Sequence, residues 1–247
     1  MSKTMQYVRI DGHGSQIVIF LHGFMSTKRY WRRAIKQLDL TECTAVSIDL
    51  LGFGKAPKPD SNYGYDEHVA HVRNTISELG FDKSQIIITG HSMGALIASR
   101  YANTYPGHVK SVGLINPPIY VDSNQAKKTL LSTGQHYRFL LLSKYRGLLW
   151  ATGRYIRLFP SHSAMSREKS LESIVIKAEF LDDVRQLSMR SLLTIGLKDR
   201  WLYQANIEQA RINDISVDVR IDNTGHHAAV THPLLVAGYI RSLFAHT

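Results

Sequence analysis

The chain of 247 residues contains little cysteine and little proline, and each scarcity excludes a class of protein. The single cysteine, Cys43, rules out an intramolecular disulfide framework and any metal site built from several cysteines. With 7 prolines and 17 glycines the chain is not collagen-like, and with 44% hydrophobic residues it is not a disordered one. Length and composition together fit one globular domain, or one domain that carries an insertion.

Long hydrophobic runs are also missing from the sequence. No segment reaches the roughly 18 uninterrupted apolar residues that a membrane-spanning helix needs. The first ten residues do not show the charged start and apolar stretch of an export signal. We therefore expect a soluble protein located in the cytoplasm.

Apolar runs typical of buried strands alternate with helix-like patterns along most of the chain. The strand-like runs occupy residues 17–21, 44–48, 85–89, 109–115, 192–195 and 216–221. Helical spacing occupies 31–38, 66–79, 92–105, 202–211 and 234–244, with Asp66 as the expected N-cap of the second helix and Gly80 as its end. Continuous apolar strands that alternate with helices predict the α/β class, with a mostly parallel, doubly wound sheet covered by helices on both faces.

The alternation of strands and helices stops between residues 118 and 189. This stretch is helix-like and contains no clear strand. We interpret it as a helical cap, or lid, that is inserted over the carboxyl ends of the strands. The core domain would then comprise residues 1–117 and 190–247.

Acidic residues are scarce, because 20 Asp and Glu stand against 30 Lys and Arg and leave a net charge of +10. Much of this excess lies in residues 123–167, which contain no Asp or Glu. The basic residues of this stretch are Lys127, Lys128, Arg138, Lys144, Arg146, Arg154, Arg157 and Arg167. A basic, apolar cap could rest on an anionic membrane surface, steer acidic substrates, or simply present solvated charges. No recognition motif accompanies the charge, so we expect no nucleic-acid partner.

One short motif joins a predicted strand to a predicted helix. Residues 90–94 read Gly-His-Ser-Met-Gly and match G-x-S-x-G, between the apolar strand that ends at residue 89 and an apolar helix. A sharp turn at this place holds the Ser92 hydroxyl clear of the sheet, and Gly90 and Gly94 leave room for it. The following helix N-terminus offers N–H groups to an anion. The pattern predicts Ser92 as a nucleophile.

A serine hydroxyl becomes a good nucleophile only when a base takes its proton, so a histidine and an orienting carboxylate are expected. His226 follows the last predicted strand on a loop at its carboxyl end, the edge of the sheet at which Ser92 lies. His227 is its neighbour and rival. The preceding Gly225 and the later Pro233 favour His226.

The carboxylate is expected at the carboxyl end of another strand. Asp199 follows the strand at 192–195 through a short loop. Asn116 occupies the rival position at the end of the preceding strand and cannot carry a charge. Asp49 ends a further strand, but its glycine-rich surroundings indicate a structural loop. The chain order Ser92, Asp199, His226 is the one that accompanies a nucleophile elbow.

Two main-chain N–H groups are predicted to bind the oxyanion. Gly23 lets the chain turn after the first apolar strand, so that the N–H of Phe24 can point inward, and the N–H of Met93 would be the second donor. We expect His22 to brace this loop and not to act as the base.

A metal site is not expected. His68 and His71 lie three residues apart beside Glu67, but the spacing is not H-E-x-x-H and no third ligand is evident. We interpret this segment as a solvated helix face, and we expect neither a metal nor another cofactor.

Taken together, residues 22–24, Asp49 with 52–54, residues 90–94, 196–199 and Gly225-His226 with Pro233 resemble the α/β-hydrolase superfamily. The resemblance implies an oxyanion loop, nucleophile, acid and base at the positions predicted above, and a cap domain in the region of residues 118–189. The motif is most similar to the esterase, lipase and C–C hydrolase branch. Ser92 departs from haloalkane dehalogenases and most epoxide hydrolases, which use Asp there.

We therefore expect a serine hydrolase that cleaves a carboxylic ester with an apolar acyl chain through a Ser-His-Asp triad and an acyl-enzyme. A C–C bond hydrolase, a thioesterase or an acyltransferase could use the same residues. A binding protein that kept the scaffold but lost turnover is the alternative from another class. The sequence leaves the natural substrate and the oligomeric state open.

Overall fold

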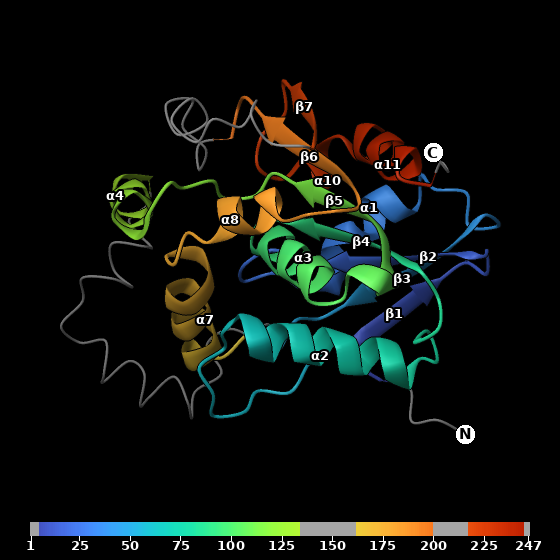
Figure 1. The fold of residues 1–247 in the computed structure, drawn as a ribbon, viewed down its shortest axis with the longest axis horizontal. Helices are drawn as coiled ribbons and strands as arrows, with labels where there is room; N and C mark the ends of the chain where they lie inside the picture. Colours follow the sequence, from blue (N-terminus) through green and yellow to red (C-terminus); the bar gives the residue numbers. More distant parts are fainter. Residues whose placement is uncertain (1–4, 134–161, 200–216, 245–247) are drawn as a thin grey trace.

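The computed structural model describes residues 5–133, 162–199 and 217–244, which form a sheet of seven strands with helices on both sides (Figure 1). The strand order is β1-β3-β2-β4-β5-β6-β7. All neighbouring strands are parallel except β1, which pairs antiparallel with β3. The strands are β1 (Val8–Asp11), β2 (Gln16–Leu21), β3 (Cys43–Ile48), β4 (Ile86–His91), β5 (Val109–Ile115), β6 (Arg190–Gly196) and β7 (Asp218–Asp222).

The central strands are apolar on both faces because each face is covered. Along β4, the side chains of Ile86 and Ile88 join one buried cluster and that of Ile87 joins the other, as the alternation of a strand requires. One cluster contains side chains of α2 (Tyr65–Glu78) and α3 (Met93–Thr104), and the second contains side chains of α1, α10 and α11. The predicted α/β class with a mostly parallel, doubly wound sheet is confirmed.

The helices of the second cluster are short. The expected helix at 31–38 is a 3-10 turn, Lys28–Trp31, followed by α1 (Arg32–Ile35). Trp31 is fully buried against this face of the sheet, together with side chains of α10 (Ala228–Thr231) and α11 (Pro233–Ser242). The helix expected at 202–211 lies outside the described residues.

The start of α2 differs from the prediction. Asp66 is not the N-cap, because the helix begins at Tyr65 and Gly64 is the capping residue. The N–H of Gly64 donates to Oε2 of Glu67 at 2.8 Å, and Asp66 lies in the first turn, where a negative charge also favours the helix. The predicted end is confirmed, since Gly80 follows the helix with a φ of +78°.

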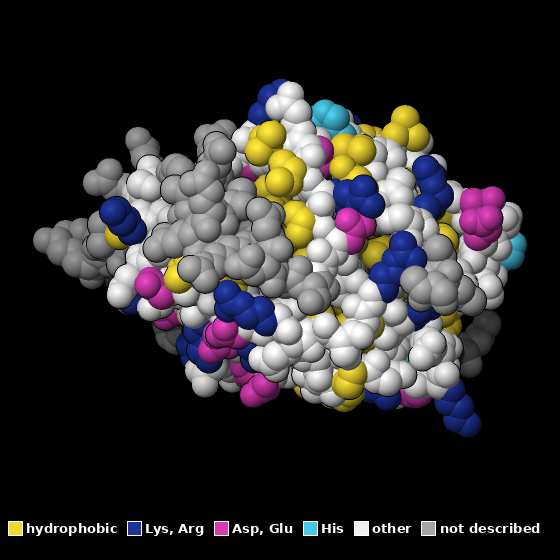
Figure 2. Space-filling model, turned by 45° about the horizontal axis from the view of Figure 1, so that its top comes forward, with side chains coloured by type: hydrophobic (Ala, Val, Ile, Leu, Met, Phe, Trp, Pro, Cys, Tyr) yellow, Lys and Arg dark blue, Asp and Glu magenta, His cyan; other side chains and the backbone are white. Residues whose placement is uncertain are grey.

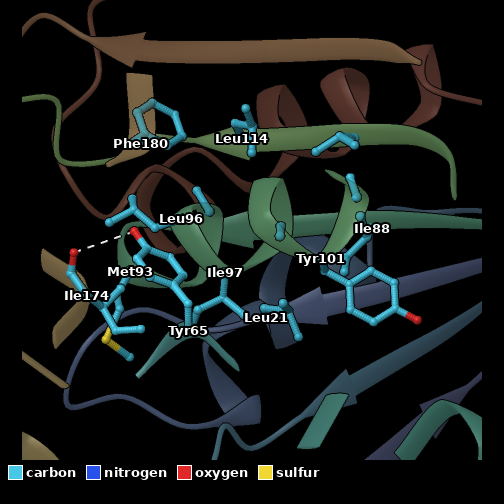
Figure 3. Close-up of a cluster of buried hydrophobic side chains, with 14 of the residues drawn as sticks. Leu21, Tyr65, Ile88, Met93, Leu96, Ile97, Tyr101, Leu114, Ile174 and Phe180 are labelled. Atoms are coloured by element: carbon cyan, nitrogen blue, oxygen red, sulfur yellow. Dashed lines mark hydrogen bonds between the residues drawn. The ribbon is translucent and has the colours of Figure 1, made fainter. Parts of the chain in front are cut away.

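The described part of residues 118–189 is helical and in part packs directly on the core. It contains α4 (Ser123–Thr133), α7 (Ala164–Ser170), a π-helical turn (Leu171–Val175) and α8 (Phe180–Arg185). Figure 3 shows Ile174 and Phe180 beside Met93 and Leu96 of α3, with the hydroxyl of Tyr65 donating to the Ile174 carbonyl. The division into core and cap domains at these boundaries stays a prediction.

The basic residues expected in the cap lie partly inside and partly outside the described residues. Arg138, Lys144, Arg146, Arg154 and Arg157 lie outside the described residues, whereas Lys127 and Lys128 lie on α4. On the face shown in Figure 2, the Lys and Arg side chains of the described residues are scattered among hydrophobic and acidic ones. Within the described residues, no helix has both the length and the apolar character needed to span a bilayer.

The glycine-rich loop after β3 is structural, as predicted. Asp49 is fully buried, and its carboxylate accepts hydrogen bonds from the N–H groups of Lys28 (2.6 Å) and Lys55 (2.9 Å). It also accepts one from Nζ of Lys28 at 2.8 Å. Gly54 faces this carboxylate with a φ of +52°, where a side chain would overlap it. Asp49 thus ties this loop to the 3-10 turn Lys28–Trp31 that precedes α1.

The prediction of a solvated helix face at His68 and His71 is wrong for His68. Its side chain is fully buried beneath α7, with Nε2 at 3.3 Å from Oγ of Ser170. Burial lowers its pKa to about 3. His71 is partly buried, and its Nε2 lies 3.0 Å from the carbonyl oxygen of Asp49. Among the described residues no group of three His, Cys, Asp or Glu could hold a metal ion.

Candidate active site

Ser92 lies on the sharp turn between β4 and α3. Its backbone has φ +52° and ψ −124°, a conformation that a non-glycine residue rarely adopts. The hydroxyl-bearing side chain is 8% exposed, and the N-terminus of α3 begins at the next residue. Strain of this kind is typical of a nucleophile held clear of the sheet.

The two glycines of the motif allow this turn. A side chain at Gly90 would overlap the main chain of Gly94, and one at Gly94 would overlap the carbonyl groups of Leu21 and His22. The close approach expected from the motif is therefore present, and α3 begins against the end of β2.

His226 and Asp199 are brought together from the loops after β7 and β6. Nδ1 of His226 lies 2.6 Å from Oδ2 of Asp199, whose side chain is 1% exposed. Nδ1–H donates to this carboxylate, which leaves Nε2 as the ring nitrogen that can accept a proton. The two loops are joined further by a bond from the N–H of Lys198 to the Thr224 carbonyl at 2.8 Å.

The competing histidines lie nearby but have other partners. His227 is exposed, and it contacts the His226 ring with a centroid distance of 5.1 Å. The part of its ring that is shielded from water and the neighbouring His226 lower the pKa of His227. His22 accepts a hydrogen bond from the N–H of Leu50 at Nε2 (3.0 Å), and its Nδ1 lies 2.8 Å from the Gly23 carbonyl oxygen. His22 therefore braces the loop, as expected.

The loop after β2 passes directly beside the nucleophile. A side chain at Gly23 would lie 3.1 Å from Cβ of Ser92 and 2.8 Å from Nδ1 of His91, so only glycine fits. Phe24 follows and lines the same cavity as Ser92. Met93 is the first residue of α3. The two predicted oxyanion donors thus flank Ser92 in the chain fold.

Ser92 and His226 line one cavity of about 170 Å³. Several apolar side chains share it, among them Phe24, whose ring also touches Phe53 edge-on. The cavity is lined by Gly23, Phe24, Met25, Ser26, Tyr30, His91, Ser92, Pro118, Tyr120, Leu130, Val175, His226 and His227. A small apolar cavity with a few converging polar groups is the usual form of a ligand site.

Two residues hold the main chain of the histidine loop, and the sequence analysis did not identify them. Nδ2 of Asn116 donates to the carbonyl oxygens of Gly225 (3.0 Å) and His226 (3.4 Å). Nε2 of His91 lies 2.7 Å from the same His226 oxygen. The one signal in the sequence is an asparagine at the end of a strand, where a carboxylate would be the rival acid.

A sequence model of the family described as "alpha/beta hydrolase fold" matches residues 16–201. The match covers most of the chain, and the fold and the geometry around Ser92 agree with it. The chain therefore belongs to the α/β hydrolase fold family.

Individual relatives match only in part. The "Probable lysophospholipase BODYGUARD 4" of Arabidopsis thaliana is 38% identical over 112 residues, which are 44% of this chain and 26% of that protein. Human "Epoxide hydrolase 4" is 27% identical over 165 residues, or 64% of this chain and 45% of that one. The chain thus spans about a quarter of the length of the first of these relatives and under half of the second.

Solved structures share the fold over almost the whole chain. An esterase from Exiguobacterium antarcticum superposes with a TM-score of 0.74 at 16% identity, covering 97% of this chain and 95% of that one. A hydrolase from Pseudomonas aeruginosa gives a TM-score of 0.75 at 14% identity, covering 97% and 94%. At this identity the likeness concerns the fold alone.

Proposed function

We propose that this chain is a serine hydrolase that cleaves carboxylic esters with an apolar acyl group through Ser92, His226 and Asp199. The observation that carries the proposal is the 2.6 Å contact between His226 and the buried Asp199, beside a cavity that His226 shares with the strained Ser92. This is the combination that nucleophilic serine catalysis needs.

The reaction follows from these positions. His226 Nε2 takes the proton of the Ser92 hydroxyl as its oxygen attacks the ester carbonyl, and the carbonyl π electrons move onto the oxygen. The N–H groups of Phe24 and Met93 stabilise this oxyanion, and Asp199 stabilises the imidazolium. The oxyanion collapses, the bond to the alcohol oxygen breaks, and His226 gives its proton to that oxygen. Water then repeats the same steps on the Ser92 ester and releases the acid.

The cavity supports an apolar acyl group. Tyr120, Leu130 and Val175 line the cavity, and all three belong to the buried hydrophobic cluster on the α3 side of the sheet. Burial of an acyl chain against such side chains is favourable by about 0.8 kcal/mol for each CH2 group. The names of two similar proteins, a probable lysophospholipase and an esterase, are compatible with this substrate class. Against epoxide hydrolysis stands Ser92 itself, since most epoxide hydrolases use Asp at this position.

The test compares purified wild type with Ser92→Ala on a panel of activated esters, thioesters and lactones. Ser99→Ala is the matched control, because Ser99 is a buried serine on α3 whose hydroxyl bonds to the Leu96 carbonyl. We expect Ser92→Ala to lose about 10³-fold or more in turnover and Ser99→Ala to keep it. Equal turnover of wild type and Ser92→Ala would refute the proposal.

A fluorophosphonate probe separates an enzyme from a silent binding protein. Wild type should be labelled at Ser92, and His226→Ala should be labelled far more slowly, since the base activates the hydroxyl. A series of esters with acyl chains of increasing length then tests the apolar preference. A strict preference for acetyl esters would contradict it.

Contact of the basic cap with an anionic membrane is a separate proposal. Lys127 and Lys128 on α4 are the part of that charge that can be varied with a known structural context. Sedimentation with anionic and neutral vesicles should show binding only to the anionic ones, weakened in the Lys127→Glu/Lys128→Glu variant. Equal and negligible binding to both vesicle types would refute the proposed contact with an anionic membrane.

A further inference from the structure

The loop that carries His226 is held by side chains from the ends of two neighbouring strands. Asn116 is the first residue after β5, and His91 is the last residue of β4. Both side chains are buried, at 1% and 2% exposure, and both reach the carbonyl oxygens of the Gly225-His226 segment. The hydrogen bonds of both side chains therefore act on the main chain of the proposed base, and the ring of His91 in addition packs against the His226 ring with centroids 4.8 Å apart.

The Asn116 side chain is itself fixed in one orientation. The carbonyl oxygens of Gly225 and His226 only accept hydrogen bonds, so Nδ2 must be the atom that faces them, and Oδ1 then accepts a hydrogen bond from Oγ1 of Thr194 on β6 at 3.3 Å. The main-chain N–H of Asn116 donates to the Thr194 carbonyl at 3.1 Å. A φ of +45°, which asparagine tolerates better than most residues, turns the side chain toward the histidine loop.

His91 donates a further hydrogen bond to the main-chain carbonyl oxygen of His226. Its ring is stacked on Tyr30 with centroids 4.2 Å apart, and its Nε2 lies 2.7 Å from the His226 carbonyl. This contact requires a proton on Nε2. Burial and the nearby His226 lower the pKa of His91 well below its usual value, so the ring is neutral and donates through this one N–H.

We propose that Asn116 is a positioning residue for His226: together with His91 it fixes the main chain of the base, while Asp199 fixes its ring. The proposal rests on the function proposed above. Three side-chain hydrogen bonds to two consecutive carbonyls hold Cα of His226 in place. Only then does the bond to Asp199 aim Nε2 toward Ser92, and a displacement of about 1 Å can cost roughly 100-fold in rate.

Two substitutions separate this role from others. Asn116→Ala removes the donor, and Asn116→Asp keeps the shape but replaces an N–H donor by a carboxylate oxygen that faces two carbonyls. Asn103→Ala and Asn103→Asp are the matched controls, because Nδ2 of Asn103 also donates to a main-chain carbonyl, that of Asp183 at 2.8 Å, on the outer side of α3.

We expect both Asn116 variants to lose roughly 10- to 100-fold in kcat for the best ester with KM changed less than about threefold. Both Asn103 variants should keep kcat within about twofold. If Asn116 were instead a vacant acid position, Asn116→Asp would be as active as wild type, and that result overturns the proposal. A fall in thermal stability with kcat unchanged would show a purely structural role and also overturn it.

A readout without substrate distinguishes failure of this proposal from failure of the proposed function. The short bond from His226 Nδ1–H to Asp199 should give a proton resonance at unusually low field in one-dimensional NMR, which His226→Gln removes. We expect Asn116→Ala to broaden or shift this signal and Asn103→Ala to leave it. An unchanged signal in Asn116→Ala contradicts the positioning role, even if no ester is hydrolysed. A shifted signal without Ser92-dependent turnover in wild type would refute the function alone.

Discussion

Acidification should destabilise this protein because buried histidines, among them the fully buried His22 and His68, are neutral in the fold. Burial lowers the pKa of His22 to about 4 and that of His68 to about 3. For His22 the Gly23 carbonyl and Asp49 oppose this shift, while Lys28 adds to it. Protonation of His22 at Nε2 would also break its bond from the N–H of Leu50.

The sign and size of the effect follow from these values. In the unfolded chain a histidine has a pKa of about 6.5, so the unfolded state gains protons first as the pH falls. The stability is present in full above pH 6.5 and is lost from there down to the folded pKa values. At pH 5 each of the two histidines should have removed about 2 kcal/mol, or about 4 kcal/mol together.

Urea unfolding followed by far-UV circular dichroism at pH 8 and pH 5 measures this loss. With a slope of about 3 kcal/mol/M, the midpoint should fall by more than about 1 M. His68→Gln should lose about 2 kcal/mol of the pH dependence, because it removes one of the buried titrating groups. His13→Gln, at an exposed position, serves as the control. If His68→Gln and wild type lost the same stability between the two pH values, burial of His68 would not be the cause.

Three further predictions concern single side chains. Gly23→Ala should lower ester turnover at least about tenfold while the protein still folds, because the new methyl group would lie 2.8 Å from Nδ1 of His91; turnover and a melting curve measured on one sample check this. Asp199→Asn should reduce kcat by about 10⁴-fold, as loss of the orienting carboxylate does in serine proteases, and steady-state kinetics would show a smaller change if another group oriented the base. Arg100→Met should destabilise the fold by about 1–3 kcal/mol in urea unfolding, because the buried Asp183 would lose its 2.7 Å partner; an unchanged midpoint would count against that ion pair.

The local elements of the fold could be predicted because each depends on nearby residues. The run of isoleucines in β4 is apolar on both faces, which only a covered sheet permits, and the G-x-S-x-G turn requires its glycines wherever it occurs. Ser92, Asp199 and His226 were singled out because each follows a strand at its carboxyl end. In a parallel sheet those ends meet at one edge.

The burial of His68 and the role of Asn116 could not be predicted in the same way. His68 is buried against Phe53, Tyr63 and Ser170, the last of which lies 102 residues later in the chain, and the spacing of residues within α2 gives no information about these contacts. Asn116 acts on carbonyl groups 109 and 110 residues away.

The sequence by itself thus determined the strands, the sharp turn and the residue types of the site, since these follow from local periodicity and backbone geometry. Only the tertiary structure decided which side chains hold the loop of His226 and which histidine of α2 is buried. Every residue has a main-chain carbonyl oxygen, so the sequence does not distinguish the ones that accept these hydrogen bonds. Their partners are determined only by which segments the fold brings together.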